Sequence, residues 1–127
     1  MDASTHLAID ATLCGQTEAL APHYCRLRLL TATRMAADDR GLVHGGFIFG
    51  MADYAAMLAV NHPNVVLGAA DARFLKPVRV GETVVAEARV ESVDGKKHTV
   101  PVTVSRDGEA VFQGTFTCFV LDRHVLD

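Results

Sequence analysis

The stretch GFIFGMADYAAMLAV, from Gly46 to Val60, decides the fold of this chain. It is rich in good helix formers and is followed by Asn61-His62-Pro63, a plausible helix stop, so we expect a helix of about four turns. Its 15 residues are too few to cross a bilayer and include Asp53, which excludes a transmembrane helix. Because the helix is apolar almost all round, protein must cover most of its sides.

Strand patterns lie on both sides of this helix. Upstream, the alternation of apolar and charged residues from Tyr24 to Thr33 predicts a half-buried strand, and the polar segment Arg34 to Leu42 is expected to be a surface loop. Downstream we predict four strands: Val65 to Lys76, Thr83 to Val93, His98 to Ser105, and Ala110 to about Leu121.

Two Asp-Gly pairs mark the turns of the last three strands. Asp94-Gly95 and Asp107-Gly108 suit type I′ hairpin turns, which need positive φ at both central residues. They predict three consecutive antiparallel strands. Pro101 lies in the middle strand and cannot donate to a ladder, which implies an edge, a bulge or local mispairing there.

The order of strand, long helix and four strands predicts one α+β domain over residues 1–127, with residues 1–23 assigned no further than a short helix or an arm. One helix on one antiparallel sheet makes two layers, but a helix apolar on all sides needs more cover than one sheet face provides. We therefore expect the sheet to wrap the helix and a second subunit to complete the cover.

Composition narrows the class of protein. The chain has 127 residues, 50% of them hydrophobic, and a formal net charge of −3, which favours a soluble globular domain and argues against non-specific binding to nucleic acid or to anionic membranes. Three cysteines without CxxC spacing suggest neither a disulfide framework nor a zinc site. Met1 to His6 lacks the features of a secretory signal, so we expect a cytoplasmic protein.

Asp53 is the anomaly of the helix, because burying a lone carboxylate among apolar residues is costly. It must face a polar cleft or a partner. Helical spacing places Gly46, Gly50, Asp53 and Met57 on one face, where the two missing side chains leave room for a ligand or a second backbone. The alternative is a structural carboxylate that is hydrogen-bonded to backbone across an interface.

His44-Gly45-Gly46 precedes the helix. Paired glycines allow close approach of a ligand, and the free N–H groups of a helix N-terminus suit an oxyanion or a carbonyl oxygen. A tight turn that needs positive φ is the alternative. Together with Asp53, these groups are the minimum set of catalytic groups needed to transfer an acyl group to water.

The run from His44 to Asp53 resembles the His-Gly-Gly-x6-Asp signature of hotdog-fold acyl-CoA thioesterases of the phenylacetate-pathway (PaaI-like) type. The segment from Phe74 to Glu82 is similar to that family's aromatic-x-x-Pro stretch followed by Gly-Asp/Glu. The likeness extends over about residues 24 to 121. It implies a hotdog fold, a curved sheet around the long helix, assembled as a homodimer or homotetramer with active sites at the dimer interface.

The resemblance also implies roles for individual residues. Asp53 would activate water or attack the thioester, the Gly46 N–H would donate to the oxyanion, and His44 would orient the loop or the thioester carbonyl. We expect Gly45 and Gly50 to contact the substrate. Many relatives carry Asn six residues before the His, whereas this chain has Asp38, which when ionised only accepts hydrogen bonds.

The predicted function is therefore hydrolysis of a small or medium acyl-CoA, aryl groups included. Coenzyme A is part of the substrate, and neither a cofactor nor a metal is expected. Basic residues that could meet its phosphates include Arg73, Lys76, Arg79, Lys96, Lys97 and Arg106.

Two other functions on the same fold stay open. One is an acyl-CoA-binding module that senses its ligand without turnover. The other is an enoyl-CoA hydratase, for which the sequence offers no convincing Asp/His pair.

Overall fold

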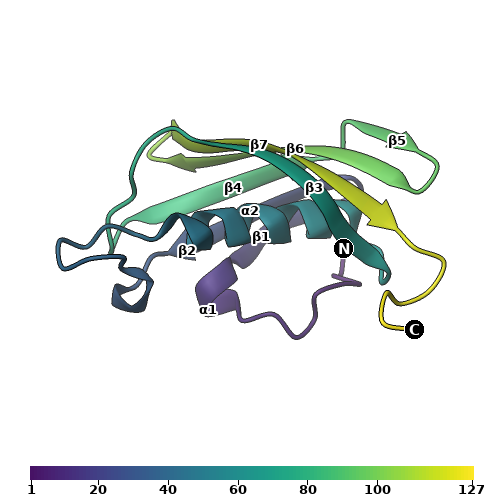
Figure 1. Cartoon of the computed structure of the whole chain (residues 1–127), viewed down its shortest axis with the longest axis horizontal. Helices are drawn as coiled ribbons and strands as arrows, with labels where there is room; N and C mark the ends of the chain where they lie inside the picture. Colours follow the sequence, from purple (N-terminus) through teal and green to yellow (C-terminus); the bar gives the residue numbers. More distant parts are fainter.

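A curved antiparallel sheet of seven strands wraps one long helix, α2 (Gly45–Val60), in a computed structural model that describes all residues from Met1 to Asp127 (Figure 1). The strand order is β1-β2-β4-β6-β7-β3, and β5 pairs with β6. No helix is long and apolar enough to span a membrane. The strands are β1 (Gln16–Ala21), β2 (Tyr24–Leu30), β3 (Val65–Phe74), β4 (Thr83–Arg89), β5 (Ser92–Asp94), β6 (Lys97–Arg106) and β7 (Glu109–Val120). The arrangement confirms the predicted α+β class and the hotdog fold.

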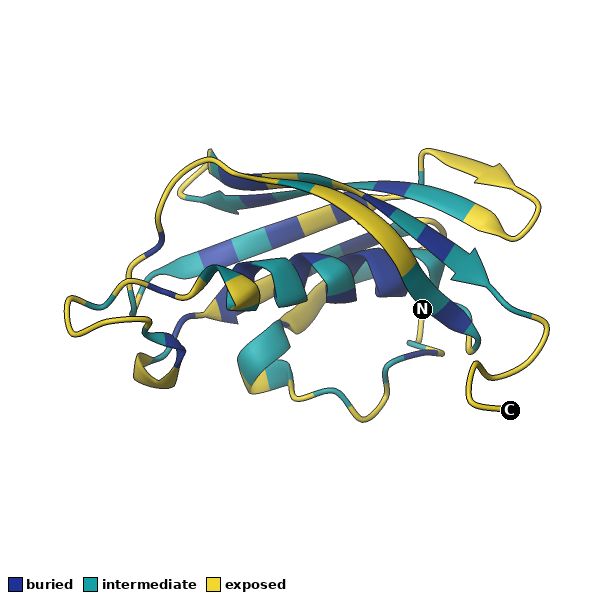
Figure 2. Ribbon diagram, in the orientation of Figure 1, coloured by how far each residue is buried: buried dark blue, intermediate teal, exposed yellow.

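The central helix confirms its prediction closely. It starts one residue earlier than expected and ends at Val60, as predicted. Asn61 caps it, with a left-handed conformation (φ 52°) and its N–H donated to the Met57 carbonyl. The later turns, Tyr54 to Ala59, are buried throughout, whereas the first turns are only partly covered (Figure 2). The sheet contributes the inward-facing residues of its strands, Cys25, Leu27 and Leu29 of β2 among them.

The N-terminal segment adds two elements that the sequence left unassigned. A short helix, α1 (Ala11–Cys14), precedes β1, which pairs with β2 and forms one edge of the sheet. β1 is mostly exposed, so its sequence lacks the apolar alternation of a half-buried strand. The strand expected from Tyr24 to Thr33 ends at Leu30. The segment expected as a surface loop from Arg34 to Leu42 instead begins within a 3₁₀ turn, η1 (Thr33–Met35), in which Met35 is buried.

The single strand predicted from Thr83 to Val93 is wrong, because the chain leaves β4 after Arg89 and resumes as β5 at Ser92. Five strands therefore follow the helix instead of four. Pro101 of β6 falls opposite this break: the pairing with β4 ends at Val102 and the pairing with β5 begins at Thr99. The sheet thus accommodates a proline in an interior strand by local mispairing, one of the three alternatives that the sequence left open.

The two hairpins differ. Asp107 and Gly108 have φ of 50° and 80° between the paired residues Arg106 and Glu109, which confirms the type I′ prediction. Asp94 instead pairs with Lys97, so the central residues of that turn are Gly95 and Lys96. Only Gly95 has positive φ, a pattern of type II′, and the type I′ prediction is wrong there.

Candidate active site

The start of α2 is fixed by backbone hydrogen bonds to two neighbouring segments. The His44 N–H donates to the Met35 carbonyl at 2.9 Å, and the Val43 N–H donates to the Val78 carbonyl, also at 2.9 Å. His44 is the N-cap residue, and its side chain makes no capping hydrogen bond. The N–H groups of Gly45 and Gly46 consequently have no acceptor in the chain. This is the donor cluster that the sequence predicted at the helix N-terminus.

The two glycines at this N-terminus differ in what lies above them. A Cβ on Gly45 would lie 3.2 Å from the ring of Phe74, so this ring occupies the space that the missing side chain leaves. A Cβ on Gly46 would lie 3.0 Å from the Nε2 atom of His44, whose exposed imidazole also packs edge-on against Phe47. Over Gly50, one turn further along, nothing lies within 4 Å. Gly50 is therefore the glycine with open space above it.

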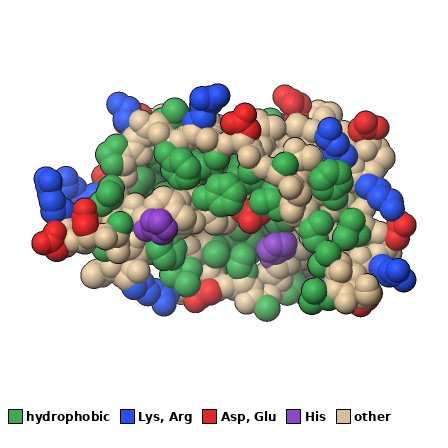
Figure 3. Space-filling view, in the orientation of Figure 1, with side chains coloured by type: hydrophobic (Ala, Val, Ile, Leu, Met, Phe, Trp, Pro, Cys, Tyr) green, Lys and Arg blue, Asp and Glu red, His purple; other side chains and the backbone are tan.

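Asp53 is partly buried, and its Oδ1 atom is fully buried without a hydrogen-bond partner. Burial raises the pKa of this carboxyl above its ordinary value of 3.8. Most buried carboxylate oxygens are hydrogen-bonded, so an oxygen left alone by its own chain is available to a substrate, a water molecule or another subunit. The alternative was a carboxylate hydrogen-bonded to backbone, and within this chain no backbone N–H donates to the Asp53 Oδ1 atom. Figure 3 shows acidic atoms enclosed by hydrophobic side chains in the middle of this face.

The charge of Asp53 acts on two thiols, those of Cys118 and Cys14, a feature that sequence patterns could not reveal. Burial raises the pKa of Cys118 to about 12, and the Asp53 carboxylate contributes to that shift. The pKa of Cys14 is also raised, by burial first and then by the negative charges of Asp10 and Asp53. Both thiols therefore stay protonated at neutral pH.

Aromatic side chains from α2, β3 and β7 pack against one another. Phe49 lies 5.4 Å from Phe116, and Phe74 lies 5.1 Å from Phe112, measured between ring centroids. An apolar pocket of about 330 Å³ opens beside them, lined by Gly45, Ile48, Phe74 and Val111 among others. The sequence indicated Phe74 only as part of a motif, because strand periodicity does not reveal that its exposed ring reaches back to the helix.

Asp38, the departure from the family pattern, lies in the exposed loop before α2. Its Oδ1 atom accepts the N–H groups of Arg40 at 3.0 Å and of Leu42 at 3.1 Å. An asparagine oxygen could accept the same two bonds, so the substitution leaves the fold of the loop intact.

The structure thus places the predicted residues along one face of α2. Gly46 and Asp53 are seven residues apart, about 10 Å along the helix axis. The His44 imidazole lies over this face at Gly46, the face is open at Gly50, and it closes at Met57, which is 1% exposed. A free donor pair, a vacant strip and an unpaired carboxylate in an apolar surround can polarise a carbonyl and activate water beside it.

The comparisons with known proteins agree with this geometry. The sequence pattern of the Thioesterase superfamily matches residues 40–113, which include every residue of the His44 to Asp53 run. An uncharacterized protein, PH1136 from Pyrococcus horikoshii, has a crystal structure with a TM-score of 0.98 and 49% identity, over 100% of this chain and 98% of that one. A mutant of the phenylacetic acid degradation protein PaaI from Thermus thermophilus has a TM-score of 0.79 and 28% identity, over 86% and 95%.

Curated relatives are longer than this chain. A methylthioribose-1-phosphate isomerase from Aquifex aeolicus is 51% identical over 96% of the chain, but the match covers 27% of that protein. Transcription factor FapR from Shouchella clausii is 34% identical over 65% of the chain and 43% of its own length. The chain therefore spans about a quarter to two fifths of the length of these relatives.

Proposed function

Because this chain belongs to the Thioesterase superfamily, we propose that it hydrolyses the thioester of a small or medium acyl-CoA, aryl groups included, to the free acid and coenzyme A. The observation that carries the proposal is the Oδ1 atom of Asp53, which is buried without a partner on the same helix face as the free Gly46 N–H. The likeness to PaaI, at 28% identity, supports the PaaI-like type. Coenzyme A enters as part of the substrate, and the reaction needs no other cofactor.

In the proposed reaction the thioester carbonyl lies over Gly50, with its oxygen directed at the Gly46 N–H. Asp53 takes a proton from water, the water oxygen bonds to the carbonyl carbon, and the Gly46 N–H stabilises the negative charge on the carbonyl oxygen. The carbon–sulfur bond then breaks, and the thiolate of coenzyme A receives the proton. In the second version Asp53 attacks the carbonyl carbon itself, and the carbon–sulfur bond breaks with release of the coenzyme A thiolate. Water then hydrolyses the resulting mixed anhydride to the free acid and the Asp53 carboxylate, and the proton released goes to the thiolate.

Burial of Asp53 suits the role of base. A carboxyl group with a raised pKa holds its proton more strongly than an exposed aspartate does, so it is a better proton acceptor at neutral pH. His44 would position the carbonyl from its place over Gly46, and Gly45 would contribute by keeping Phe74 at the wall of the apolar pocket.

A second copy of the chain would complete the site. The first turns of α2 are partly exposed, and β3 is an edge strand whose residues Gly68 to Asp71 are exposed (Figure 2). Ala70 pairs with the buried Phe116 and so lies on the helix side of the sheet, yet it remains exposed. An uncovered edge strand next to an uncovered helix face is the surface that a homodimer would cover.

The test measures release of free thiol from acyl-CoAs of increasing chain length and from aryl-CoAs. The wild type should release thiol from at least one substrate, and Asp53→Asn should not. Full hydrolysis by both Asp53→Ala and Asp53→Asn of every thioester that the wild type cleaves would overturn the mechanism.

The likeness to FapR, a transcription factor, favours a second candidate, a domain that binds acyl-CoA without turnover. Tight binding of acyl-CoA by the wild type, with no thiol released from any member of the panel, would support this function over hydrolysis.

A further inference from the structure

A hollow of about 520 Å³ lies between the loop that precedes α2, the loop that joins β3 to β4, and the end of β6. Arg40, Arg79 and Arg106 are among the residues that line it, and we call it the arginine hollow. The hydrolysis described above makes no use of it.

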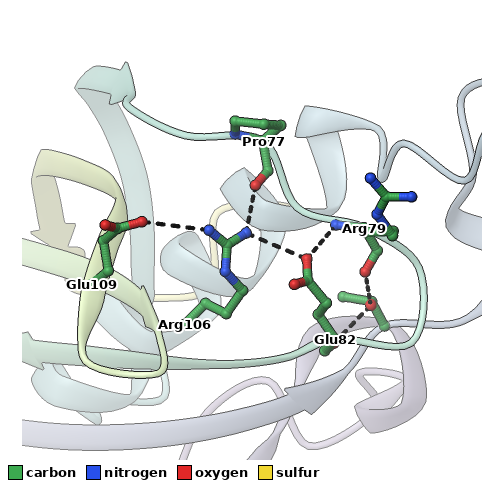
Figure 4. A network of polar contacts seen from close by, with 6 residues as sticks. Pro77, Arg79, Glu82, Arg106 and Glu109 are labelled. Atoms are coloured by element: carbon green, nitrogen blue, oxygen red, sulfur yellow. Dashed lines mark hydrogen bonds and ion pairs between the residues drawn. The ribbon is translucent and has the colours of Figure 1, made fainter.

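Arg106 forms its hydrogen bonds and ion pairs within the protein. Its Nη1 atom donates to the Pro77 carbonyl at 2.6 Å and lies 3.3 Å from Glu82, while its Nη2 atom lies 3.5 Å from Glu109 (Figure 4). Its side chain is 19% exposed, the lowest exposure in any ion pair of this chain. Arg106 therefore supports the β3–β4 loop, and two carboxylates balance its charge.

The carboxylates that line the hollow also have hydrogen-bond partners within the chain. Besides Arg106, Glu82 accepts the backbone N–H of Arg79 at 2.6 Å, and Asp38 accepts the two loop N–H groups described above. The guanidinium groups of Arg40 and Arg79 form no ion pair and no hydrogen bond in the chain, and in Figure 4 no dashed line reaches the Arg79 guanidinium. Two free cations thus line one concave site.

The backbone beneath these two arginines is held in place. Arg79 pairs with Leu42 in a β-bridge, and the Val80 N–H donates to the Gly41 carbonyl at 2.8 Å. The buried hydroxyl of Thr31 donates to the Arg79 carbonyl at 3.1 Å. Because both loops are joined to each other and to the core, the two guanidinium groups lie on a common support, which lowers the entropy cost of binding one anion between them.

The hollow adjoins the candidate active site. Pro77 lines both the arginine hollow and the apolar pocket that contains Gly45. Residues 38 to 44 lead directly from the hollow to the N-terminus of α2. A ligand with a thioester at α2 and an anionic far end could therefore occupy both places.

We infer that the arginine hollow binds a phosphate group at the nucleotide end of the acyl-CoA substrate, with Arg40 and Arg79 as the phosphate-binding residues. The inference rests on the proposed function for the identity of its ligand. A planar guanidinium donates two parallel hydrogen bonds to phosphate oxygens, and two guanidinium groups match the charge of a phosphate monoester or of a diphosphate.

The test is calorimetric titration of the full chain with coenzyme A, 3′-dephospho-coenzyme A and pantetheine. Arg79→Gln should weaken the binding of coenzyme A about tenfold, and Arg40→Gln with Arg79→Gln about a hundredfold, while pantetheine binding stays unchanged. Arg123→Gln is the matched control: it removes one exposed cation from the C-terminal segment, at the opposite end of the molecule from the hollow (Figure 1), and should leave all three affinities unchanged.

The three ligands separate the two phosphate sources. If the hollow holds the 3′-phosphate, the wild type binds 3′-dephospho-coenzyme A as weakly as the double variant binds coenzyme A. If it holds the diphosphate, removal of the 3′-phosphate has little effect. Equal coenzyme A affinity in the wild type and the double variant, or no binding of coenzyme A by the wild type, would overturn the inference.

Binding is measured apart from turnover, so the two proposals fail separately. Coenzyme A binding that depends on Arg79 without hydrolysis of any thioester would refute the hydrolase and keep the hollow. Hydrolysis with an unchanged KM in the double variant would keep the hydrolase and refute the hollow.

Discussion

The imidazole of His44 lies over Gly46, so that a Cβ on Gly46 would stand 3.0 Å from the His44 Nε2 atom. The contact is with the far end of an exposed side chain and not with backbone, so the imidazole can move away from an added methyl group. The Gly46 N–H has no backbone acceptor in the chain. His44, which we propose positions the carbonyl, thus lies next to Gly46, whose N–H we propose binds the carbonyl oxygen.

Gly46→Ala should therefore lower kcat/KM about tenfold or more while leaving stability near that of the wild type. The methyl group displaces His44 and narrows the approach to the oxyanion donor, whereas alanine is well tolerated in a helix. Thiol-release kinetics and thermal unfolding check the two parts. In thermal unfolding only, Gly50→Ala is the matched variant for helix propensity, because its methyl group meets open space in the free protein, the space in which we propose that the thioester carbonyl lies. A fully active Gly46→Ala enzyme would refute the assigned oxyanion site.

Asp53→Asn should lower kcat at least about a hundredfold, because the amide neither accepts a proton from water nor attacks the thioester. Coenzyme A affinity should change by less than about twofold, since the substitution keeps the shape of the side chain. In the wild type, the rate should fall as the pH is lowered through the pKa of Asp53, which burial places above 3.8. An acidic limb centred at or below the ordinary value would contradict the assignment.

The same substitution should stabilise the fold at neutral pH. Because burial raises the pKa of Asp53, the folded protein binds more protons than the unfolded chain between pH 3.8 and the raised value. The free energy of unfolding therefore falls as the pH rises through that window, and the loss is complete above it. Asp53→Asn should recover about 1 kcal/mol at pH 7, and the gain should shrink toward about pH 4. Urea unfolding at both pH values measures it, and a gain independent of pH would count against ionisation as the cause.

Arg106→Ala should lower the free energy of unfolding by about 1 kcal/mol, because it removes a hydrogen bond to the Pro77 carbonyl and two ion pairs. Arg106→Lys should lower the free energy of unfolding by less than Arg106→Ala does, because the ammonium group keeps the positive charge. Some loss should remain, since an ammonium group does not reach all three acceptors in the way that a guanidinium does. Urea unfolding is the measurement, and Arg123→Gln again serves as the control. A variant as stable as the wild type would show that the network of Figure 4 is not what holds the β3–β4 loop.

Ala70→Glu should convert the expected dimer to a monomer and reduce thiol release, because it places a charge on the uncovered helix side of β3. Ala21→Glu changes an exposed alanine of β1, the other edge of the sheet, and should leave the assembly unchanged. Sedimentation velocity at micromolar concentration distinguishes the two. A stable, folded wild-type monomer under these conditions would refute the dimer.

The central elements could be predicted from sequence because their signals are local. The helix from Gly45 to Val60 follows from helix propensity and a stop signal, and the Asp107-Gly108 turn follows from a dipeptide that tolerates positive φ. β1 could not be predicted, because an exposed edge strand carries no apolar alternation. The break between Arg89 and Ser92 could not be predicted either, because it depends on β6 pairing with two successive strands, β4 and β5.

The sequence by itself determined the long apolar helix, the strands that cover it and the single carboxylate that such a helix cannot bury cheaply. Only the tertiary structure decided what surrounds that carboxylate: its Oδ1 atom finds no partner, Phe74 covers Gly45, and Gly50 stays open. It also brought Arg40 and Arg79 to one hollow, although 38 residues separate them in the chain. Helix and strand preferences act between near neighbours, whereas burial and charge depend on which distant segments the fold brings into contact.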